Sequence, residues 1–195
     1  MALNPIITWT FFFADTAAPT NPGPYLFRSF NFPQHYLSFK TGTTEGFIAN
    51  NNKQGFLVVP CLAGNKNAVS LKLYTKQNFY LKADLERMLI NVEVKQTNSD
   101  FSLASCFKIR HNQFKDGFVA FESLAKPGHF IRHQGYRLKL HPAASDELYK
   151  KDASFSMRLN YEGKLLYIFF FQVFLQCNYK FFIHVNINGK TKVKC

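Results

Sequence analysis

Few residues of this sequence have the types and spacings that catalytic groups require. The chain has 195 residues, with 12 Asp and Glu, 6 His and 4 Cys. It contains no nucleophile-elbow motif, no His-Glu-x-x-His metal motif and no glycine-rich phosphate loop. Glycoside hydrolysis needs two carboxylates about 5–9.5 Å apart, and nothing in the spacing of the acidic residues singles out such a pair. We therefore expect a non-enzymatic protein that needs neither a metal nor another cofactor.

The cysteines give no sign of metal or redox chemistry. Cys61, Cys106, Cys177 and Cys195 are far apart, and none belongs to a Cys-x-x-Cys motif. Cys106 directly precedes a phenylalanine that begins an alternating segment, so the side chain of Cys106 is expected to be buried or half-buried. The sequence favours a free core thiol at Cys106 over a disulfide bridge.

The elements that must position any binding site are short strands. Within residues 118–158, alternating apolar and polar residues predict four of them: Phe121–Ser123, Phe130–His133, Tyr136–Leu140 and Phe155–Arg158. Lys126-Pro127-Gly128 predicts a turn between the first two strands, and a polar loop precedes the last. No segment here has a capped 3.6-residue period, which predicts an all-β fold.

The same pattern occurs three times along the chain. Aligning Phe27, Leu71 and Phe121 places an aromatic ring nine residues later in each copy, followed by an aliphatic residue. The rings are Tyr36, Tyr80 and Phe130, and the aliphatic residues are Leu37, Leu81 and Ile131. Each copy closes on a phenylalanine that begins the last strand: Phe56, Phe107 and Phe155.

Three repeats of four strands predict a β-trefoil. The copies recur every 44–51 residues, a period that indicates an architecture built by repetition. Helical solenoids of this period need helical patterns that the sequence lacks, and a propeller needs at least about four blades. We therefore predict a β-trefoil over residues 25–161. Its core should contain the opening, aliphatic and closing residues of every copy: Phe27, Leu37, Phe56, Leu71, Leu81, Phe107, Phe121, Ile131 and Phe155.

Two separated motifs give the sequence a family resemblance. Copy one has Phe27-Arg28-Ser29-Phe30-Asn31-Phe32-Pro33, and copy three has Arg132-His133 and later Asp152-Ala153-Ser154-Phe155. These segments resemble the arabinose-binding module of α-L-arabinofuranosidase B, a carbohydrate-binding β-trefoil. Similar domains occur in large secreted animal glycoproteins of the otogelin type. In that family hydrolysis belongs to a separate catalytic domain, so the resemblance implies a binding role and an extracellular location.

The resemblance implies at most one intact sugar site, in copy three. In the family, a histidine of the Arg-His motif and the aspartate of the closing motif hold a furanose, which implies sugar-binding roles for His133 and Asp152. A sugar also needs an aromatic wall, for which Tyr136 and Tyr149 are candidates. The corresponding residues of copy two are Ala83 and Ala104, and those of copy one are Phe39 and Lys53. An alternative role for His133 and Asp152 is a hydrogen bond that ties two strands together.

Two functions remain open at this point. One is a glycan-binding module for arabinofuranose or a related saccharide; the other is a degenerate trefoil that serves as a structural or protein-interaction domain of an extracellular glycoprotein. The net charge of +12 fits a polyanion ligand, but the sequence favours a solvated surface with scattered lysines over a dedicated polyanion site. Nucleic acid is not expected, because no nucleic-acid-binding motif is present. A heparin-binding trefoil would need Lys and Arg clustered on one loop.

Both ends of the chain differ from the trefoil pattern. Residues 1–24 are predicted to be a leader or linker that ends in Asn21-Pro22-Gly23-Pro24, and they lack the basic start of a clear signal peptide. Residues 162–195 have a composition typical of AT-rich codons. We interpret this tail as translated non-coding sequence, with a membrane-associating amphiphile and a native partner strand as alternatives. Its apolar run of eleven residues is too short to span a membrane as a helix.

Overall fold

The structure, a computed structural model, describes residues 23–160, and these residues form a 12-stranded β structure with two short helices. Copy one contains β1 (Tyr25–Ser29), β2 (Tyr36–Phe39), β3 (Gly46–Ala49) and β4 (Phe56–Pro60). Copy two contains β5 (Val69–Leu73), β6 (Phe79–Asp84), β7 (Leu89–Val94), α1 (Ser99–Ala104) and β8 (Phe107–His111). Copy three contains β9 (Val119–Ser123), β10 (His129–Gln134), β11 (Arg137–Pro142), α2 (Glu147–Asp152) and β12 (Phe155–Leu159).

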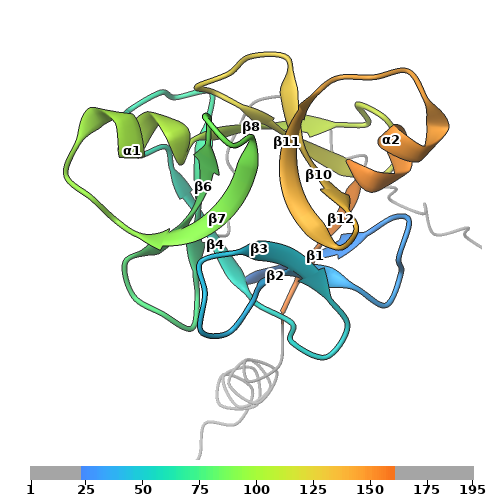
Figure 1. The fold of residues 1–195 in the computed structure, drawn as a ribbon, viewed down its shortest axis with the longest axis horizontal. Helices are drawn as coiled ribbons and strands as arrows, with labels where there is room; N and C mark the ends of the chain where they lie inside the picture. The colour runs from blue at the N-terminus through green and yellow to red at the C-terminus, as the bar shows by residue number, and fades with distance from the viewer. Residues whose placement is uncertain (1–22, 161–195) are drawn as a thin grey trace, which may run out of the picture. The chain divides into compact units, whose positions relative to one another are not determined.

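The strands form a closed barrel and a cap. In the barrel, β1 pairs with β4, β4 with β5, β5 with β8, β8 with β9, β9 with β12, and β12 with β1. The hairpins β2–β3, β6–β7 and β10–β11 surround a common centre and form the cap (Figure 1). This arrangement is a β-trefoil, as the repeats predicted.

The strand register confirms the alignment of the copies. The closing residues Phe155, Phe56 and Phe107 lie opposite Ser29, Leu73 and Ser123, which are equivalent positions of the opening strands. The aromatic rings that follow are also equivalent, because Tyr36, Tyr80 and Phe130 each pair with the residue after the aligned opening residue. Residues can therefore be compared between copies position by position.

All nine residues predicted for the core are inaccessible to solvent. Each has an exposed fraction of 0%: Phe27, Leu37, Phe56, Leu71, Leu81, Phe107, Phe121, Ile131 and Phe155. Three residues from each copy thus contribute to one core, where Phe27 contacts both Phe56 and Phe121 through its ring. Large side chains from different copies lie against one another, so the barrel cannot close unless every copy is in register.

The polar loop of copy three contains a helix that the sequence did not reveal. Asp146 caps α2 by accepting a hydrogen bond from the Tyr149 backbone N–H, at 2.8 Å. Asn98 caps α1 in the same way, through the Phe101 backbone N–H. Six residues are too few to show a helical period, so the prediction of an uninterrupted loop was wrong. Tyr136 also lies in the turn before β11 rather than in the strand.

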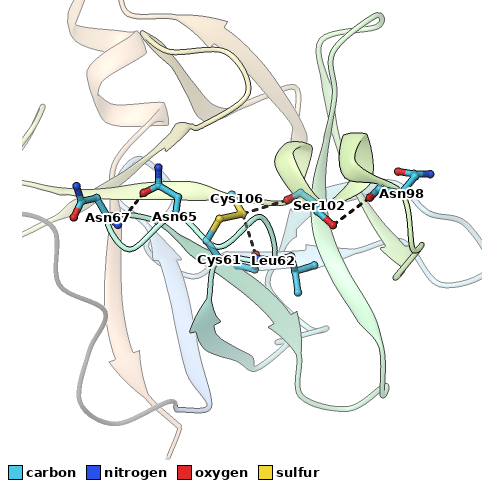
Figure 2. The surroundings of a disulfide bond; sticks show 8 residues. Cys61, Leu62, Asn65, Asn67, Asn98, Ser102 and Cys106 are labelled. Carbon is cyan, nitrogen blue, oxygen red and sulfur yellow. Dashed lines mark hydrogen bonds between the residues drawn. A yellow bond between two sulfur atoms is a disulfide. The ribbon is translucent and has the colours of Figure 1, made fainter.

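Cys106 is buried, as predicted, but the expectation of a free thiol was wrong. Cys106 forms a disulfide with Cys61, and the two residues are 45 positions apart in the sequence (Figure 2). Cys61 follows β4 and Cys106 precedes β8, so the bond links copy one to copy two. Barrel closure brings these positions together. Cys177, Cys195, the predicted tail and residues 1–22 of the predicted leader lie outside the described residues.

We expect truncation of the central rings to be costly. Phe107→Ala and Phe155→Ala should each lower the free energy of unfolding by about 3–5 kcal/mol, because each leaves a cavity in a fully buried core. Urea denaturation would measure the loss. Leu148→Ala is the matched control, since Leu148 is 58% exposed and its truncation should change stability little. Costs below about 1 kcal/mol at both phenylalanines would contradict the core described here.

The disulfide should contribute measurably to stability. A cross-link that closes a loop of 45 residues restricts the unfolded chain and is expected to stabilise the fold by about 2–4 kcal/mol. The double variant Cys61→Ser, Cys106→Ser should therefore unfold at a lower urea concentration than the unaltered protein. A reducing agent should lower the midpoint of the unaltered protein and leave that of the double variant unchanged. Equal responses to the reducing agent would exclude a stabilising Cys61–Cys106 bond.

Candidate functional site

The structure brings the predicted residues His133 and Asp152 together. His133 lies in β10, and Asp152 is the last residue of α2. Their side chains approach to 3.6 Å between His133 Nδ1 and Asp152 Oδ1. Both are almost fully buried, with exposed fractions of 1% and 4%. The helix ends where the Ala153 backbone N–H donates to the Tyr149 carbonyl at 2.9 Å, and this end places the Asp152 carboxylate beside the imidazole.

Both oxygens of Asp152 accept hydrogen bonds from other parts of the chain. Arg132 Nη2 donates to Oδ2 at 2.7 Å, and Asn31 Nδ2 donates to Oδ1 at 2.8 Å. Asn31 follows β1, so copy one completes the surroundings of a carboxylate that belongs to copy three. The Arg132 guanidinium provides the opposite charge that a buried carboxylate requires.

His133 is also tied to copy one. Its Nε2 lies 2.8 Å from Ser29 Oγ, which in turn accepts a hydrogen bond from the Phe32 backbone N–H at 3.1 Å. If the Ser29 hydroxyl donates to Nε2, the proton of the neutral ring is on Nδ1 and faces Asp152. Burial lowers the pKa of His133 from 6.5 to about 4; Asp152 opposes this shift, whereas Arg132 and His35 add to it. His133 is therefore neutral at pH 7.

The series Ser29, His133 and Asp152 has the order of a hydrolase triad but lacks an accessible nucleophile. Ser29 is buried, with its hydroxyl engaged by the Phe32 backbone and by His133. A catalytic serine must reach a substrate carbonyl beside donors that stabilise the oxyanion. The distance of 3.6 Å between His133 and Asp152 is also longer than a hydrogen bond. Ser29 thus orients the imidazole and does not act as an exposed nucleophile.

An aromatic cluster covers one side of His133. The Phe32 ring lies 5.4 Å from His133 and 5.3 Å from Tyr136, and the His35 ring stacks on Tyr136 at 5.3 Å. Gly135 and Tyr136 form the turn of the β10–β11 hairpin, with φ angles of 58° and 65°. A tight hairpin turn requires such positive φ angles, and Met88, directly before β7, also has one, of 55°. Tyr136 is 48% exposed, so its ring is available to a ligand.

Tyr149, the other predicted aromatic residue, lies inside the protein. Its ring contacts Phe114, and the Arg132 guanidinium lies 5.2 Å from the ring centre. Its hydroxyl donates to the His141 carbonyl at 3.3 Å, and burial raises the pKa of Tyr149 to about 12. The buried Tyr149 ring packs against Arg132, whereas the ring of Tyr136 reaches the surface.

Two polar atoms of the cluster have no hydrogen-bond partner among residues 23–160. They are Arg132 Nε and His35 Nδ1, and both are buried. Buried polar atoms normally find partners, so each unsatisfied atom requires an explanation such as a ligand. Within the described part of the chain, no three His, Cys, Asp or Glu side chains are grouped closely enough to hold a metal ion. No helix of these residues is long and apolar enough to cross a membrane.

Reasoning from the sequence found His133 and Asp152 but missed the residues that copy one contributes. The motif of copy one that carries the family resemblance contains Ser29, Asn31 and Phe32, and His35 follows it. The sequence alone gave these residues no role in the site of copy three. The trefoil itself contains the missing signal. Since β1 pairs with β12, the loop that follows β1 must lie beside the end of copy three.

The other two junctions between copies have different side chains at these positions. At the junction of copies two and three, Ala83 and Ala104 occupy the positions of His133 and Asp152, by the register established above. At the junction of copies one and two, Phe39 and Lys53 occupy them. The combination of His133 and Asp152 is therefore present at one junction only, between copies three and one.

Comparisons with known proteins agree with this architecture. Residues 25–157 match the family model described as "Alpha-L-arabinofuranosidase B (ABFB) domain". No curated protein sequence matches the chain. A GH54 α-L-arabinofuranosidase soaked with a cyclic sulfate inhibitor has a TM-score of 0.64 and 15% identity, over 74% of this chain and 33% of the enzyme.

Two further solved structures share the fold. An arabinofuranosidase complexed with arabinofuranosyl-α-1,2-xylobiose has a TM-score of 0.64 and 14% identity, over 74% of this chain and 33% of that chain. The BEL β-trefoil in an apo crystal form has a TM-score of 0.58 and 10% identity, over 73% and 97% of the two chains. At these identities the similarity establishes the fold, and the chain spans about one third of the length of the arabinofuranosidases.

The neutral state of His133 predicts a pH dependence of stability. Unfolded His133 takes up a proton as the pH falls below about 6.5, whereas the folded protein resists protonation until about pH 4. The free energy of unfolding should therefore decrease as the pH falls from 6.5 to 4, by at most about 1.4 kcal/mol per pH unit. Urea denaturation at several pH values would measure this slope. The slope should be smaller in His133→Gln, and equal slopes would contradict a buried neutral histidine.

Proposed function

Because the chain belongs to the α-L-arabinofuranosidase B domain family, we propose that residues 25–157 form a non-catalytic carbohydrate-binding module. Its one furanose site would lie at the junction of copies three and one. The ligand would be arabinofuranose or a related saccharide, presented at the end of a glycan chain.

One observation carries this proposal: hydrogen-bonding groups from copies three and one converge beside an exposed aromatic ring. Asp152 and His133 form the buried base of the cluster, and Asn31 adds an amide. A carboxylate offers about four acceptor positions, so Asp152 can accept further bonds from sugar hydroxyls. The unpartnered atoms Arg132 Nε and His35 Nδ1 supply polar groups for the sugar oxygens. The Tyr136 ring offers a flat surface to the C–H face of the sugar.

The contacts of Asp152 support a binding role over a hydrolytic one. Hydrolysis by a pair of carboxylates would require a second acid near Asp152. The side chains that contact Asp152 are instead Arg132, Asn31 and His133. The Arg132 guanidinium donates to Asp152 Oδ2 at 2.7 Å, so the carboxylate is held as a hydrogen-bond acceptor beside a positive charge.

An extracellular location is also part of the proposal. The Cys61–Cys106 disulfide supports it, because disulfides persist in oxidising compartments and are rare in the cytosol. Glycans that carry terminal furanose residues would be encountered there. The solved arabinofuranosidase complexed with arabinofuranosyl-α-1,2-xylobiose makes this trisaccharide a suitable first ligand to test.

A second candidate function is a structural or protein-interaction domain. One observation favours it: both carboxylate oxygens of Asp152 already accept hydrogen bonds within the protein, so the cluster can serve as a tie between copies three and one. In that case no saccharide would bind, and the substitution of Asp152 would affect stability alone.

Tyr136→Gly provides the cleanest test of the sugar site. It removes the exposed ring and suits the positive φ of residue 136, so it should preserve the fold. We expect the unaltered protein to bind arabinofuranosyl-xylobiose with a dissociation constant near the millimolar level, about −4 kcal/mol. Tyr136→Gly should weaken this binding at least tenfold, as measured by NMR titration, while the urea midpoint remains the same or rises.

Tyr74→Ala serves as the matched control, because Tyr74 is another exposed tyrosine, in copy two, and its removal should leave binding unchanged. Asp152→Asn should abolish binding and also destabilise the protein, since it leaves the buried Arg132 without its counter-charge. If the unaltered protein binds no arabinose-containing saccharide while Asp152→Asn is destabilised, the second candidate function is correct.

A further inference from the structure

The junction of copies one and two is an inverted-charge counterpart of the candidate sugar site. Lys53 stands three residues before the closing Phe56, the position that Asp152 has before Phe155. Lys76 has the position of Phe32. A carboxylate and an apolar ring are thus both replaced by ammonium groups.

The ring contacts of Lys76 at this junction resemble those of Phe32 at the candidate sugar site. Lys76 Nζ lies 5.3 Å from the ring centres of both Phe39 and Phe79. These two rings are the equivalents of His133 and His35, which Phe32 contacts at 5.4 and 5.5 Å. Lys76 therefore lies between the same two ring positions that flank Phe32 at the sugar site.

The second lysine belongs to the same junction. Lys53 Nζ lies 4.9 Å from the centre of the Tyr36 ring, at the other end of β2 from Phe39. Thr75 Oγ1 donates to Gln54 Oε1 at 3.0 Å, and these two residues are the chain neighbours of Lys76 and Lys53. Cation–π contacts of this kind orient an ammonium group without neutralising its charge.

Neither lysine has an acidic partner. Among residues 23–160, no carboxylate oxygen lies within 4.0 Å of Lys53 or Lys76, and both side chains are exposed. Some other basic residues are paired, such as Lys82 with Glu93, Arg110 with Glu122 and Lys115 with Glu147. Two oriented ammonium groups at one junction, both unpaired among residues 23–160, favour an anionic ligand.

We propose that this junction binds the anionic group of an acidic saccharide, either the carboxylate of a uronic acid or a sulfate ester. Lys53 and Lys76 would hold the anion between them, and the Gln54 and Thr75 side chains would bind neighbouring hydroxyls. The choice of a saccharide rests on the proposed function, whereas the choice of an anion rests on the two lysines. Residues 23–160 contain 19 Lys and Arg against 10 Asp and Glu, so their overall field also attracts such a ligand.

The test compares two double variants that lose the same charge. Lys53→Gln, Lys76→Gln removes the proposed site, and Lys66→Gln, Arg158→Gln removes two exposed basic residues elsewhere. Each protein is titrated with a heparin tetrasaccharide, trigalacturonic acid, arabinofuranosyl-xylobiose and a twelve-residue oligothymidylate. We expect the first variant to bind at least one acidic saccharide at least tenfold more weakly than the unaltered protein. The second variant should remain within twofold, and arabinofuranosyl-xylobiose binding should be unaffected in both.

Each other outcome would overturn the proposal. Equal weakening in both double variants would indicate a diffuse basic surface, and binding of neither acidic saccharide would exclude the site. Oligothymidylate binding as tight as that of the acidic saccharides, with the same dependence on Lys53 and Lys76, would indicate a nucleic-acid surface instead. The two acidic saccharides distinguish sulfate from carboxylate recognition. Failure of the furanose site would appear separately, as a lack of arabinofuranosyl-xylobiose binding to the unaltered protein.

Discussion

The pairing of the first strand with the last is the interaction on which the rest of the structure depends. Five residue pairs join β1 to β12, from Tyr25 opposite Leu159 to Ser29 opposite Phe155. Further backbone hydrogen bonds at both ends extend the pairing, from Phe30 to Ser154 and from Asn160 to Pro24. Without it the barrel would have two open edges, and Ser29 would be separated from His133 by 104 positions of unconstrained chain. The candidate sugar site therefore exists only when the barrel is closed.

The repeats made the fold predictable because their signals are local. Alternation along each strand and a fixed spacing between rings identified all nine core residues and the trefoil. The helix α2 was not predicted, because six residues are too few to show a helical period. The disulfide was not predicted, because it joins Cys61 and Cys106 from different copies. Half of the candidate site escaped for a similar reason. Ser29 and Asn31 of copy one contact His133 and Asp152 of copy three. These contacts become visible only when closure of the barrel places the two copies side by side.

The copies agree in the core and differ at the junctions, and the energetics explain why. A core ring such as Phe27 contacts Phe121 of another copy, and truncation of such a ring costs about 3–5 kcal/mol. The position of Asp152 lies outside this core cluster in every copy, so a different side chain there leaves the core rings in place. The position occupied by Asp152 in copy three can therefore carry Lys53 in copy one and Ala104 in copy two. One scaffold can present three differently charged junctions without any change in its core.

This internal comparison also bears on the role of the buried ion pair between Arg132 and Asp152. Buried ion pairs are weak evidence for stability, because desolvation offsets much of the attraction between the charges. Copy two closes its corner of the barrel with Lys82 and Ala104 at these positions, and copy one does so with Ser38 and Lys53. The fold thus forms this corner twice without the pair. Among residues 23–160, Arg132 Nε and His35 Nδ1 also lack a hydrogen-bond partner, and both observations support the proposed ligand over a purely structural role for the charged cluster of copy three.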